Sequence, residues 1–476
     1  MSQQAAYDTY ASPFSTRYVS PEMSRLFSQQ FKIATFRRLW VALAKAQKQL
    51  GLPISDEQIQ QMEKHVETID FHQVHIYEKQ LRHDVMAHIH AFGDQCPDAK
   101  PILHLGATSS YVADNTDLIQ MKEAMRLLHA KLLSLIQKLS KLAKLHANDP
   151  TLSYTHYQPA QPTTIGKRFC LWLQDFYQDV LDWERLENSL PFLGVKGATG
   201  TQASFLSLLN GDEEKAKELE SLIANAFGFS HVLPIAGQTY SRKIDLSLLN
   251  SLESFAASAH KMATDLRLLA HEGEIQEAFE EKQVGSSAMP YKRNPIYTER
   301  ICGLARFVIS LAQNPAYTAA TQWLERSLDD SSNRRLCIPE AFLAADALLN
   351  LLAHIIDHLH VDAALAKQHT LEHLPLLALE NILMNAVKKG ESRQDAHETL
   401  RSLSIASKKE NDPHAFLIRE ITSRFSLSES EVKTFLDLKT MIGLAPRQVH
   451  DFLQADIEPY LTKYQEKKAL FPSVDI

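Results

Sequence analysis

The most regular pattern of apolar residues in this chain runs from residue 118 to residue 145. Steps of three and four follow one another without a break through Leu118, Met121, Met125, Leu128, Leu132, Leu135, Leu139 and Leu142. This heptad pattern predicts a helix that packs in a left-handed bundle at small crossing angles. The polar run at 114–117 offers capping residues before the helix, and Asn148-Asp149-Pro150 ends it. At 1.5 Å per residue, such a helix is about 42 Å long.

Four further segments have a similar period, at 166–189, 243–272, 297–313 and 338–360. With the first segment, they predict a bundle of long helices in the middle of the chain. Shorter helical stretches precede the bundle, with breaks at Gly51-Leu52-Pro53 and at Gly93, and others follow it, with breaks at Lys389-Gly390 and Asp412-Pro413. We therefore predict an all-α fold with three helical domains, at 1–108, 109–361 and 362–476.

Composition supports this fold class. Only 15 of the 476 residues are glycine, and none lies between Gly106 and Gly166 or between Gly303 and Gly390. Sheet proteins turn tightly and often, so they rarely lack glycine over such distances, whereas long helices do not need it. With 45% hydrophobic residues, the chain has ample material for two or three cores.

Charge and cysteine content exclude several classes of protein. The net charge is −7 and no segment is a block of Lys and Arg, which argues against non-specific binding to nucleic acid or to anionic membranes. The four cysteines form no CxxC pair, the N-terminus has no apolar leader, and no apolar run approaches the roughly 20 residues of a membrane span. We expect a cytoplasmic protein with no nucleic-acid or membrane partner.

The sequence GSSAMPYKRNP at 285–295 has the composition of a functional loop. Its two prolines, its glycine and its two serines disfavour both helix and strand. Together with Lys292 and Asn294 it offers hydroxyls, backbone N–H groups and cations, which suit an anion that develops charge during a reaction. From these residues alone, an ordinary solvated turn is an equal alternative.

A second candidate is His156 in the sequence THYQPAQPT at 155–163, where neighbouring prolines predict a strained loop just before the 166–189 helix. A lone histidine is more often structural than catalytic. His354 and His358 have the spacing of metal ligands on a helix, but no acidic residue completes an HExxH arrangement. We therefore expect no metal site there.

Both loops resemble segments of the fumarase/aspartase superfamily. Residues 285–295 resemble its GSSxMPxKxNP loop, residues 155–163 resemble its TH-x-QPAQ segment, and the form MPYKRNP resembles the adenylosuccinate lyase family in particular. The resemblance implies that Ser286 is the catalytic base and His156 the general acid. It also implies that Lys292 and Asn294 bind a substrate carboxylate.

Other segments extend this resemblance along nearly the whole chain. It implies that the following residues hold a nucleotide and its succinyl group: Arg17, Tyr18, Arg82, His83, Asp84, Thr108, Ser109, Gln238, Arg300, Arg326, Ser331 and Arg335. Among these, Arg17, Arg326 and Arg335 suit a phosphate because a guanidinium presents two parallel donors. By composition alone, the segment at 325–335 would be a solvated helix start with paired charges.

The implied reaction is a β-elimination that breaks a C–N bond and releases fumarate. The implied substrates are adenylosuccinate, which gives AMP, and succinyl-aminoimidazole-carboxamide ribotide (SAICAR), which gives AICAR. No cofactor and no metal are expected. The resemblance also implies a homotetramer whose sites are shared between subunits. The alternatives are another fumarate-releasing lyase, such as argininosuccinate lyase or fumarase, and a non-enzymatic structural homologue.

Overall fold

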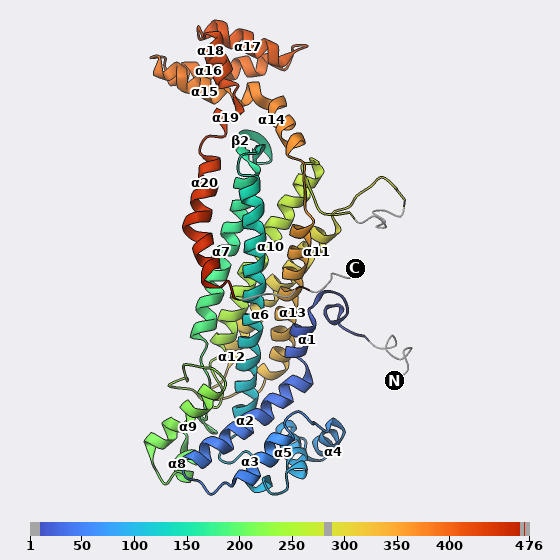
Figure 1. The fold of residues 1–476 in the computed structure, drawn as a ribbon, viewed down its shortest axis with the longest axis vertical. Helices are drawn as coiled ribbons and strands as arrows, with labels where there is room; N and C mark the ends of the chain where they lie inside the picture. The colour runs from blue at the N-terminus through green and yellow to red at the C-terminus, as the bar shows by residue number, and fades with distance from the viewer. Residues whose placement is uncertain (1–9, 280–287, 467–470, 472–476) are drawn as a thin grey trace.

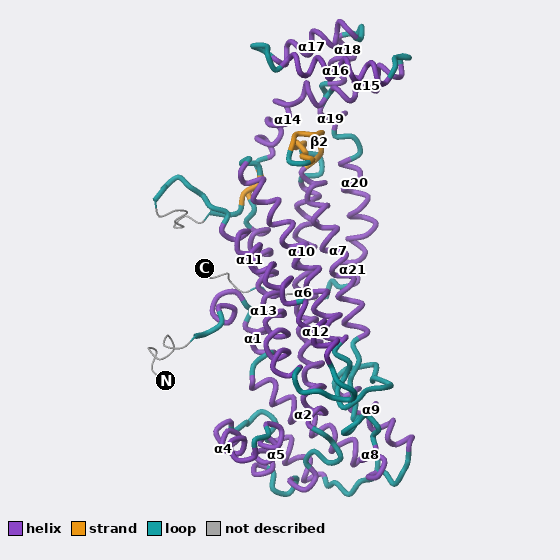
Figure 2. Tube along the Cα trace, turned by 180° about the vertical axis from the view of Figure 1, so that it is seen from behind, coloured by secondary structure: helices purple, strands orange, loops and turns teal. Residues whose placement is uncertain are grey.

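The computed structural model describes residues 10–279, 288–466 and 471. Within these residues the chain is built mainly from helices, and the longest of them run along one axis of the molecule (Figure 1). Among the described residues, the strands form two short antiparallel pairs (Figure 2). The predicted all-α class is confirmed.

The five segments with heptad-like periods each form a helix of the central bundle. They are α6 (Ser109–Leu145), α7 (Ile165–Ser189), α10 (Lys243–His271), α11 (Ile296–Leu311) and α13 (Asp330–Asp357). α6 packs along α7 and α13, and α10 packs along α7, α11 and α13. Because β3 (Ile275–Gln276) follows α10 and pairs with β4 (His360–Val361) after α13, these two helices end at the same end of the bundle.

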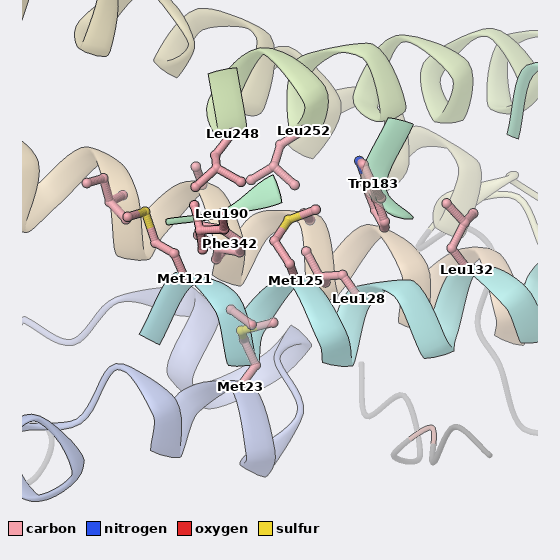
Figure 3. Packing of buried hydrophobic residues seen from close by; sticks show 14 of the residues in the cluster. Met23, Met121, Met125, Leu128, Leu132, Trp183, Leu190, Leu248, Leu252 and Phe342 are labelled. Carbon is pink, nitrogen blue, oxygen red and sulfur yellow. The ribbon is translucent and has the colours of Figure 1, made fainter. Parts of the chain in front are cut away.

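The apolar face that the heptad pattern predicts fills the interior of this bundle. Four apolar side chains of α6 that point inward are at most 1% exposed: Met121, Met125, Leu128 and Leu132. They pack with side chains of α7, α10 and α13, which Figure 3 shows as Trp183, Leu248, Leu252 and Phe342. α13 is long and apolar enough to cross a membrane by composition, but 78% of its apolar window is buried inside the protein. Burial in the core accounts for its composition.

The predicted start of α6 was wrong. The helix begins at Ser109, with Thr108 as its N-cap, so residues 114–117 lie inside it. Asp114, Asn115 and Thr116 are buried there, at 3% exposure or less. Asp114 is tolerated in the helix interior because it pairs with Arg242, and Asn115 because its side chain donates to the Tyr111 and Gly194 carbonyls.

Two other boundaries also differ from the prediction. Gly93 does not break a helix, because it lies within α5 (Asp84–Gln95), where an added Cβ would meet the Lys100 side chain at 3.0 Å. It is a packing glycine. α13 begins at Asp330, eight residues before the predicted start at 338, because its first two turns bury charged rather than apolar side chains.

Shorter helices cover the end of the bundle where α6, α10 and α13 begin. They are α2 (Gln29–Gln49), α3 (Asp56–Lys64), α4 (Phe71–Leu81), α5, α8 (Ala203–Leu208) and α9 (Glu213–Ala226), at the bottom of Figure 1. Gly51 follows α2 with φ +100°, a conformation that favours glycine, so the predicted break there is confirmed. α1 (Pro21–Leu26) lies further along the bundle, and α12 (Gln313–Thr321) joins α11 to α13.

The opposite end carries β1 (Pro150–Thr155), β2 (Gln158–Thr164) and a separate helical unit. That unit contains α15 (Leu379–Lys388), α16 (Arg393–Ser407), α17 (Pro413–Arg424), α18 (Glu429–Phe435) and α19 (Leu438–Met441), and α14 (Ala363–Leu377) leads into it. The predicted breaks at Lys389-Gly390 and Asp412-Pro413 are confirmed, and this unit has its own apolar core. The chain then returns along the bundle as α20 (Ala445–Phe452) and α21 (Glu458–Lys463), whose buried residues join the bundle core.

The close approach of α6 and α7 leads to a stability prediction. An added Cβ on Gly166 would lie 2.4 Å from the Ala143 carbonyl oxygen, whereas one on Gly303, also within a helix, would meet nothing within 4 Å. We expect Gly166→Ala to destabilise the protein by about 1–3 kcal/mol through overpacking. Gly303→Ala should leave stability unchanged or raise it by up to about 1 kcal/mol through helix propensity. Equal thermal midpoints for the two variants, at one protein concentration, would contradict this.

Candidate functional site

Many of the predicted substrate-binding residues lie at the end of the bundle where α6, α10 and α13 begin. There the first turns of α6 and α13 face α2 and α5 across a cleft of about 340 Å³. Four predicted residues line it: Asp84, Arg326, Ser331 and Arg335. The lining contains five basic and five acidic side chains, so the cleft of a single chain has no net formal charge.

The turn between α4 and α5 brings Arg82, His83 and Asp84 to the cleft region. Arg82 ends α4 in a left-handed conformation, with φ +53°, and His83 caps α5 by accepting the Met86 N–H on Nδ1 at 3.2 Å. The Asp84 carboxylate accepts a hydrogen bond from Arg335 at 3.4 Å. This contact links the predicted triplet to the start of α13, while the side chains of all three residues stay exposed.

The segment around Gln238 lies beside the same cleft. Its backbone N–H donates to the Glu325 carbonyl at 3.1 Å, which places it next to Arg326. The Gln238 side chain accepts from the Ser110 hydroxyl at 3.4 Å, close to Thr108 and Ser109 at the start of α6. The structure therefore brings these three predicted residues near the 326–335 segment.

A buried charge network forms the inner wall of the cleft, and sequence reasoning missed it. Arg242 donates to Asp114 at 2.9 Å and to Asp330 at 2.7 Å, and all three side chains are at most 4% exposed. Arg334 pairs in the same way with Asp117 at 2.9 Å and with Asp245 at 2.7 Å. Charged residues at otherwise buried helix positions were the signal available in the sequence.

This network sets the electrostatics of the cleft. Burial alone would raise the pKa of Asp117, but the combined attraction of Arg334, Lys32 and Arg242 outweighs burial and holds that pKa below its ordinary value. Burial lowers the pKa of His88, which also lines the cleft, to about 4, so this imidazole is neutral at pH 7. Asp330 lies 3.7 Å from Arg326 while it also binds Arg242, so it connects the buried network to a predicted phosphate ligand.

His156 lies at the other end of the bundle, in the two-residue turn between β1 and β2. His156 and Tyr157 both have left-handed backbone conformations, with φ +54° and +57°. Such turns favour Asn and Gly, so these larger residues carry backbone strain, as predicted for this loop. The two strands were not predicted, because Pro159 and Pro162 argue against a ladder. The His156 side chain is exposed at the tip of the turn.

A third group lies at the start of α11. Ser286 lies outside the described residues. Lys292 is exposed, Asn294 is half-buried, and Arg300 is half-buried with its guanidinium 5.8 Å from the ring centre of Tyr297.

A glutamate fixes the base of this loop. Glu277 accepts the backbone N–H groups of Tyr297 at 2.9 Å and Thr298 at 3.0 Å, so a residue before the loop binds the first turn of the helix after it. Burial raises the pKa of Glu277, although these hydrogen bonds oppose the shift.

Arg17 and Tyr18 form a fourth group, in a single helical turn (Phe14–Tyr18) beside α13. The Asn350 side chain donates to the Tyr18 carbonyl at 3.0 Å. Asn350 lies 19 residues beyond Ser331 on α13, or about 28 Å at 1.5 Å per residue. Within one chain, Arg17 and Tyr18 are therefore remote from the other predicted phosphate ligands.

The histidines with metal-ligand spacing pack with aromatic rings. The His354 ring lies 4.6 Å from that of Tyr297 and 4.9 Å from that of His358. In the part of the chain that the structure describes, no group of three or more His, Cys, Asp or Glu side chains is placed to hold a metal ion.

Comparisons with known proteins identify the class to which this fold and these residues belong. A family profile described as "Lyase" matches residues 17–310, which is more than half of the chain. A solved structure of 3-carboxy-cis,cis-muconate lactonizing enzyme from Pseudomonas putida has the same fold, with a TM-score of 0.81 and 22% identity over 96% of this chain and 100% of that one. The protein is a member of this family of helical lyases.

The family can be stated more narrowly. A profile described as "Adenylosuccinate lyase C-terminus" matches residues 375–452. Adenylosuccinate lyase of Schizosaccharomyces pombe is 47% identical over 96% of this chain and 97% of its own length. The Saccharomyces cerevisiae enzyme is 46% identical over 97% of each. The chain belongs to the adenylosuccinate lyase family, and the roles of the individual site residues remain predictions.

The cleft's inner wall gives a second testable prediction. Asp330→Asn removes a buried carboxylate that pairs with Arg242, so it should destabilise the protein by about 3 kcal/mol or more. The neighbouring Asp329 is exposed, and its carboxylate accepts a hydrogen bond from the Ser327 hydroxyl at 2.7 Å. Asp329→Asn is thus a matched control that should change stability by less than about 0.5 kcal/mol. Thermal unfolding of both variants measures the difference, and equal midpoints would show that Asp330 is not part of a stabilising network.

Proposed function

We propose that this protein cleaves adenylosuccinate to AMP and fumarate by β-elimination, and cleaves SAICAR to AICAR in the same way. The observation that carries the proposal is the 46–47% identity to yeast adenylosuccinate lyases along nearly the whole length of both chains. The GSSAMPYKRNP loop and the THYQPAQ segment supply the residue types that this reaction requires.

The chemistry requires removal of a carbon-bound proton next to a carboxylate. Charge then spreads into that carboxylate, which needs donors that are already in place. In our proposal, Lys292, Asn294 and loop N–H groups donate to it while Ser286 takes the proton. His156 in its protonated form gives a proton to the departing purine nitrogen, so that the C–N bond breaks without release of an unstable anion.

We further propose that the sites are shared between the subunits of a homotetramer. α6 runs from the cleft, which it lines as far as Gln120, to Leu145 near the end that carries His156. These 25 residues span about 38 Å. No nucleotide bridges that distance, so a site that uses both groups needs more than one chain.

Exposed apolar side chains support this assembly. Tyr317, Trp323, Leu328 and Leu336, in and around α12 and the start of α13, are 69–75% exposed in the single chain. Large apolar side chains gathered in this way are typical of a surface that another protein covers. Closed symmetry would then give equivalent sites.

The activity and the general acid can be tested together. The purified protein should convert adenylosuccinate to AMP and fumarate, followed by absorbance, and should not cleave argininosuccinate or hydrate fumarate. His156→Gln should lower kcat by about 10²–10⁴-fold with little change in KM, because it acts on the transition state. His358→Gln is the control: it is the exposed C-cap residue of α13 and its Nδ1 lies 2.9 Å from the His354 carbonyl, so kcat should not change. Near-normal kcat for His156→Gln would remove it from the mechanism.

Mixing of inactive variants tests the shared site. His83→Ala and His156→Ala alter groups at opposite ends of one chain. If the two residues reach a site from different subunits, 1:1 mixing with subunit exchange restores one half times one half, or about a quarter, of the sites. The control mixes His83→Ala with Arg335→Ala, whose residues lie together in one chain through the Asp84–Arg335 contact, and should restore nothing. No recovery in the first mixture after verified exchange would refute the shared site.

A further inference from the structure

Three polar side chains lie in the middle of the bundle, where the surrounding positions are apolar. Asp346 and Asn350 are four residues apart on α13, and Lys131 faces them from α6. Lys131 and Asp346 are fully buried, with 0% side-chain exposure, and Asn350 is 2% exposed. Asp346 and Asn350 interrupt the buried run 344–353 of α13, which otherwise consists of Ala and Leu.

These side chains satisfy one another almost completely. The Lys131 ammonium donates to Asp346 Oδ1 at 2.5 Å and to Asn350 Oδ1 at 2.8 Å, and Asn350 Nδ2 donates to Asp346 Oδ2 at 3.2 Å. Asp346 Oδ2 can accept one more hydrogen bond, and Asn350 Nδ2 has one more N–H to donate.

The N-terminal segment makes both of the remaining contacts. The Ser20 N–H donates to Asp346 Oδ2 at 2.7 Å, and the Tyr18 carbonyl accepts from Asn350 Nδ2 at 3.0 Å. The cluster therefore complements the backbone of residues 18–20: its free acceptor, Asp346 Oδ2, meets the Ser20 N–H, and its free donor, Asn350 Nδ2, meets the Tyr18 carbonyl. Ser20 also caps α1, whose first residue is Pro21, so the segment continues into a defined helix start.

The energetics indicate that this cluster is not there for stability. A buried ion pair loses the hydration of both charges, and apolar residues of similar volume often give equal or greater stability. Buried polar groups of this kind can instead select one arrangement of neighbouring segments. Here the segment selected carries Arg17 and Tyr18, whose predicted role is to bind the nucleotide.

We infer that Lys131, Asp346 and Asn350 are positioning residues that dock the 17–20 segment on the bundle and so place Arg17 and Tyr18 for substrate binding. The inference rests on the proposed function for the role of Arg17 and Tyr18. The docking itself rests only on the contacts above. The three residues do not touch the substrate, and their effect passes through the backbone at Tyr18 and Ser20.

The test replaces the cluster with apolar residues, in the variant Lys131→Met/Asp346→Leu/Asn350→Leu. Lys138→Met is the matched control, because Lys138 pairs with Asp357 across the same two helices, about two turns further along α6. Two quantities are measured besides the thermal midpoint: KM and kcat for adenylosuccinate, and the rate of trypsin cleavage after Arg17, which mass spectrometry identifies by the fragment that begins at Tyr18.

For the triple variant we expect a thermal midpoint close to that of the wild type, trypsin cleavage after Arg17 at least about tenfold faster, and KM raised about tenfold at nearly constant kcat. Lys138→Met should leave the cleavage rate and KM unchanged. Unchanged cleavage and KM in the triple variant would overturn the inference. The inference would also be overturned if Arg17→Ala raised KM while the triple variant kept the wild-type KM.

If the triple variant does not fold, Asn350→Ala provides the second test. It keeps the Lys131–Asp346 pair and removes the donor to the Tyr18 carbonyl, together with the bonds of Asn350 to Lys131 and Asp346. Faster cleavage and a higher KM are again expected, and their absence overturns the inference. Trypsin cleavage does not depend on turnover. A wild-type protein that fails to cleave adenylosuccinate would thus refute the proposed function, while the docking of the segment would be judged separately from the cleavage rates.

Discussion

The length and stiffness of α6 determine how far apart the reactive groups of one chain lie. Its 37 residues form a single unbroken helix, packed along α7 and α13. The cleft with Asp84 and Arg335 lies beside its N-terminal part, from Ala113 to Gln120, and the strained turn with His156 lies beyond its last turn. Neither group can approach the other without unfolding a helix whose buried face is part of the main core. The two groups of one chain are therefore held apart rigidly.

Buried charges recur where helices must hold a particular position. At the start of the bundle, Arg242 joins Asp114 of α6 to Asp330 of α13, and in the middle Lys131 of α6 joins Asp346 of α13. An apolar interface between two helices tolerates small axial shifts, whereas a paired charge in a dry interior does not, because a shift leaves it unpaired. Both networks adjoin residues with predicted substrate contacts. The bundle thus fixes the axial position of those residues to within a hydrogen-bond length.

The bundle could be predicted from the sequence because a heptad period is a one-dimensional property of each helix. The start of α6 could not, because Asp114 resembles a capping residue until Arg242, 128 positions later, is known to lie beside it. The hairpin that carries His156 could not be predicted, because Pro159 and Pro162 lie in its second strand and proline normally argues against a strand. The resemblance to a known family predicted the site residues. The fold adds that, within one chain, these residues lie in separate groups: at the cleft, in the β1–β2 turn, at the start of α11 and at residues 17–18.

The charge balance of the cleft bears on how the separate groups would act together. Five acidic side chains offset its five basic ones, and His88 is neutral at pH 7, so one chain's cleft offers no net attraction to an anion. Adenylosuccinate bears two carboxylates and a phosphate. In the proposed assembly, the missing positive charge comes from groups that are remote in the same chain, Arg17 and Lys292, both exposed. Binding of the anionic substrate would then require the assembled protein, since each chain alone pairs the arginines of its cleft with its own carboxylates.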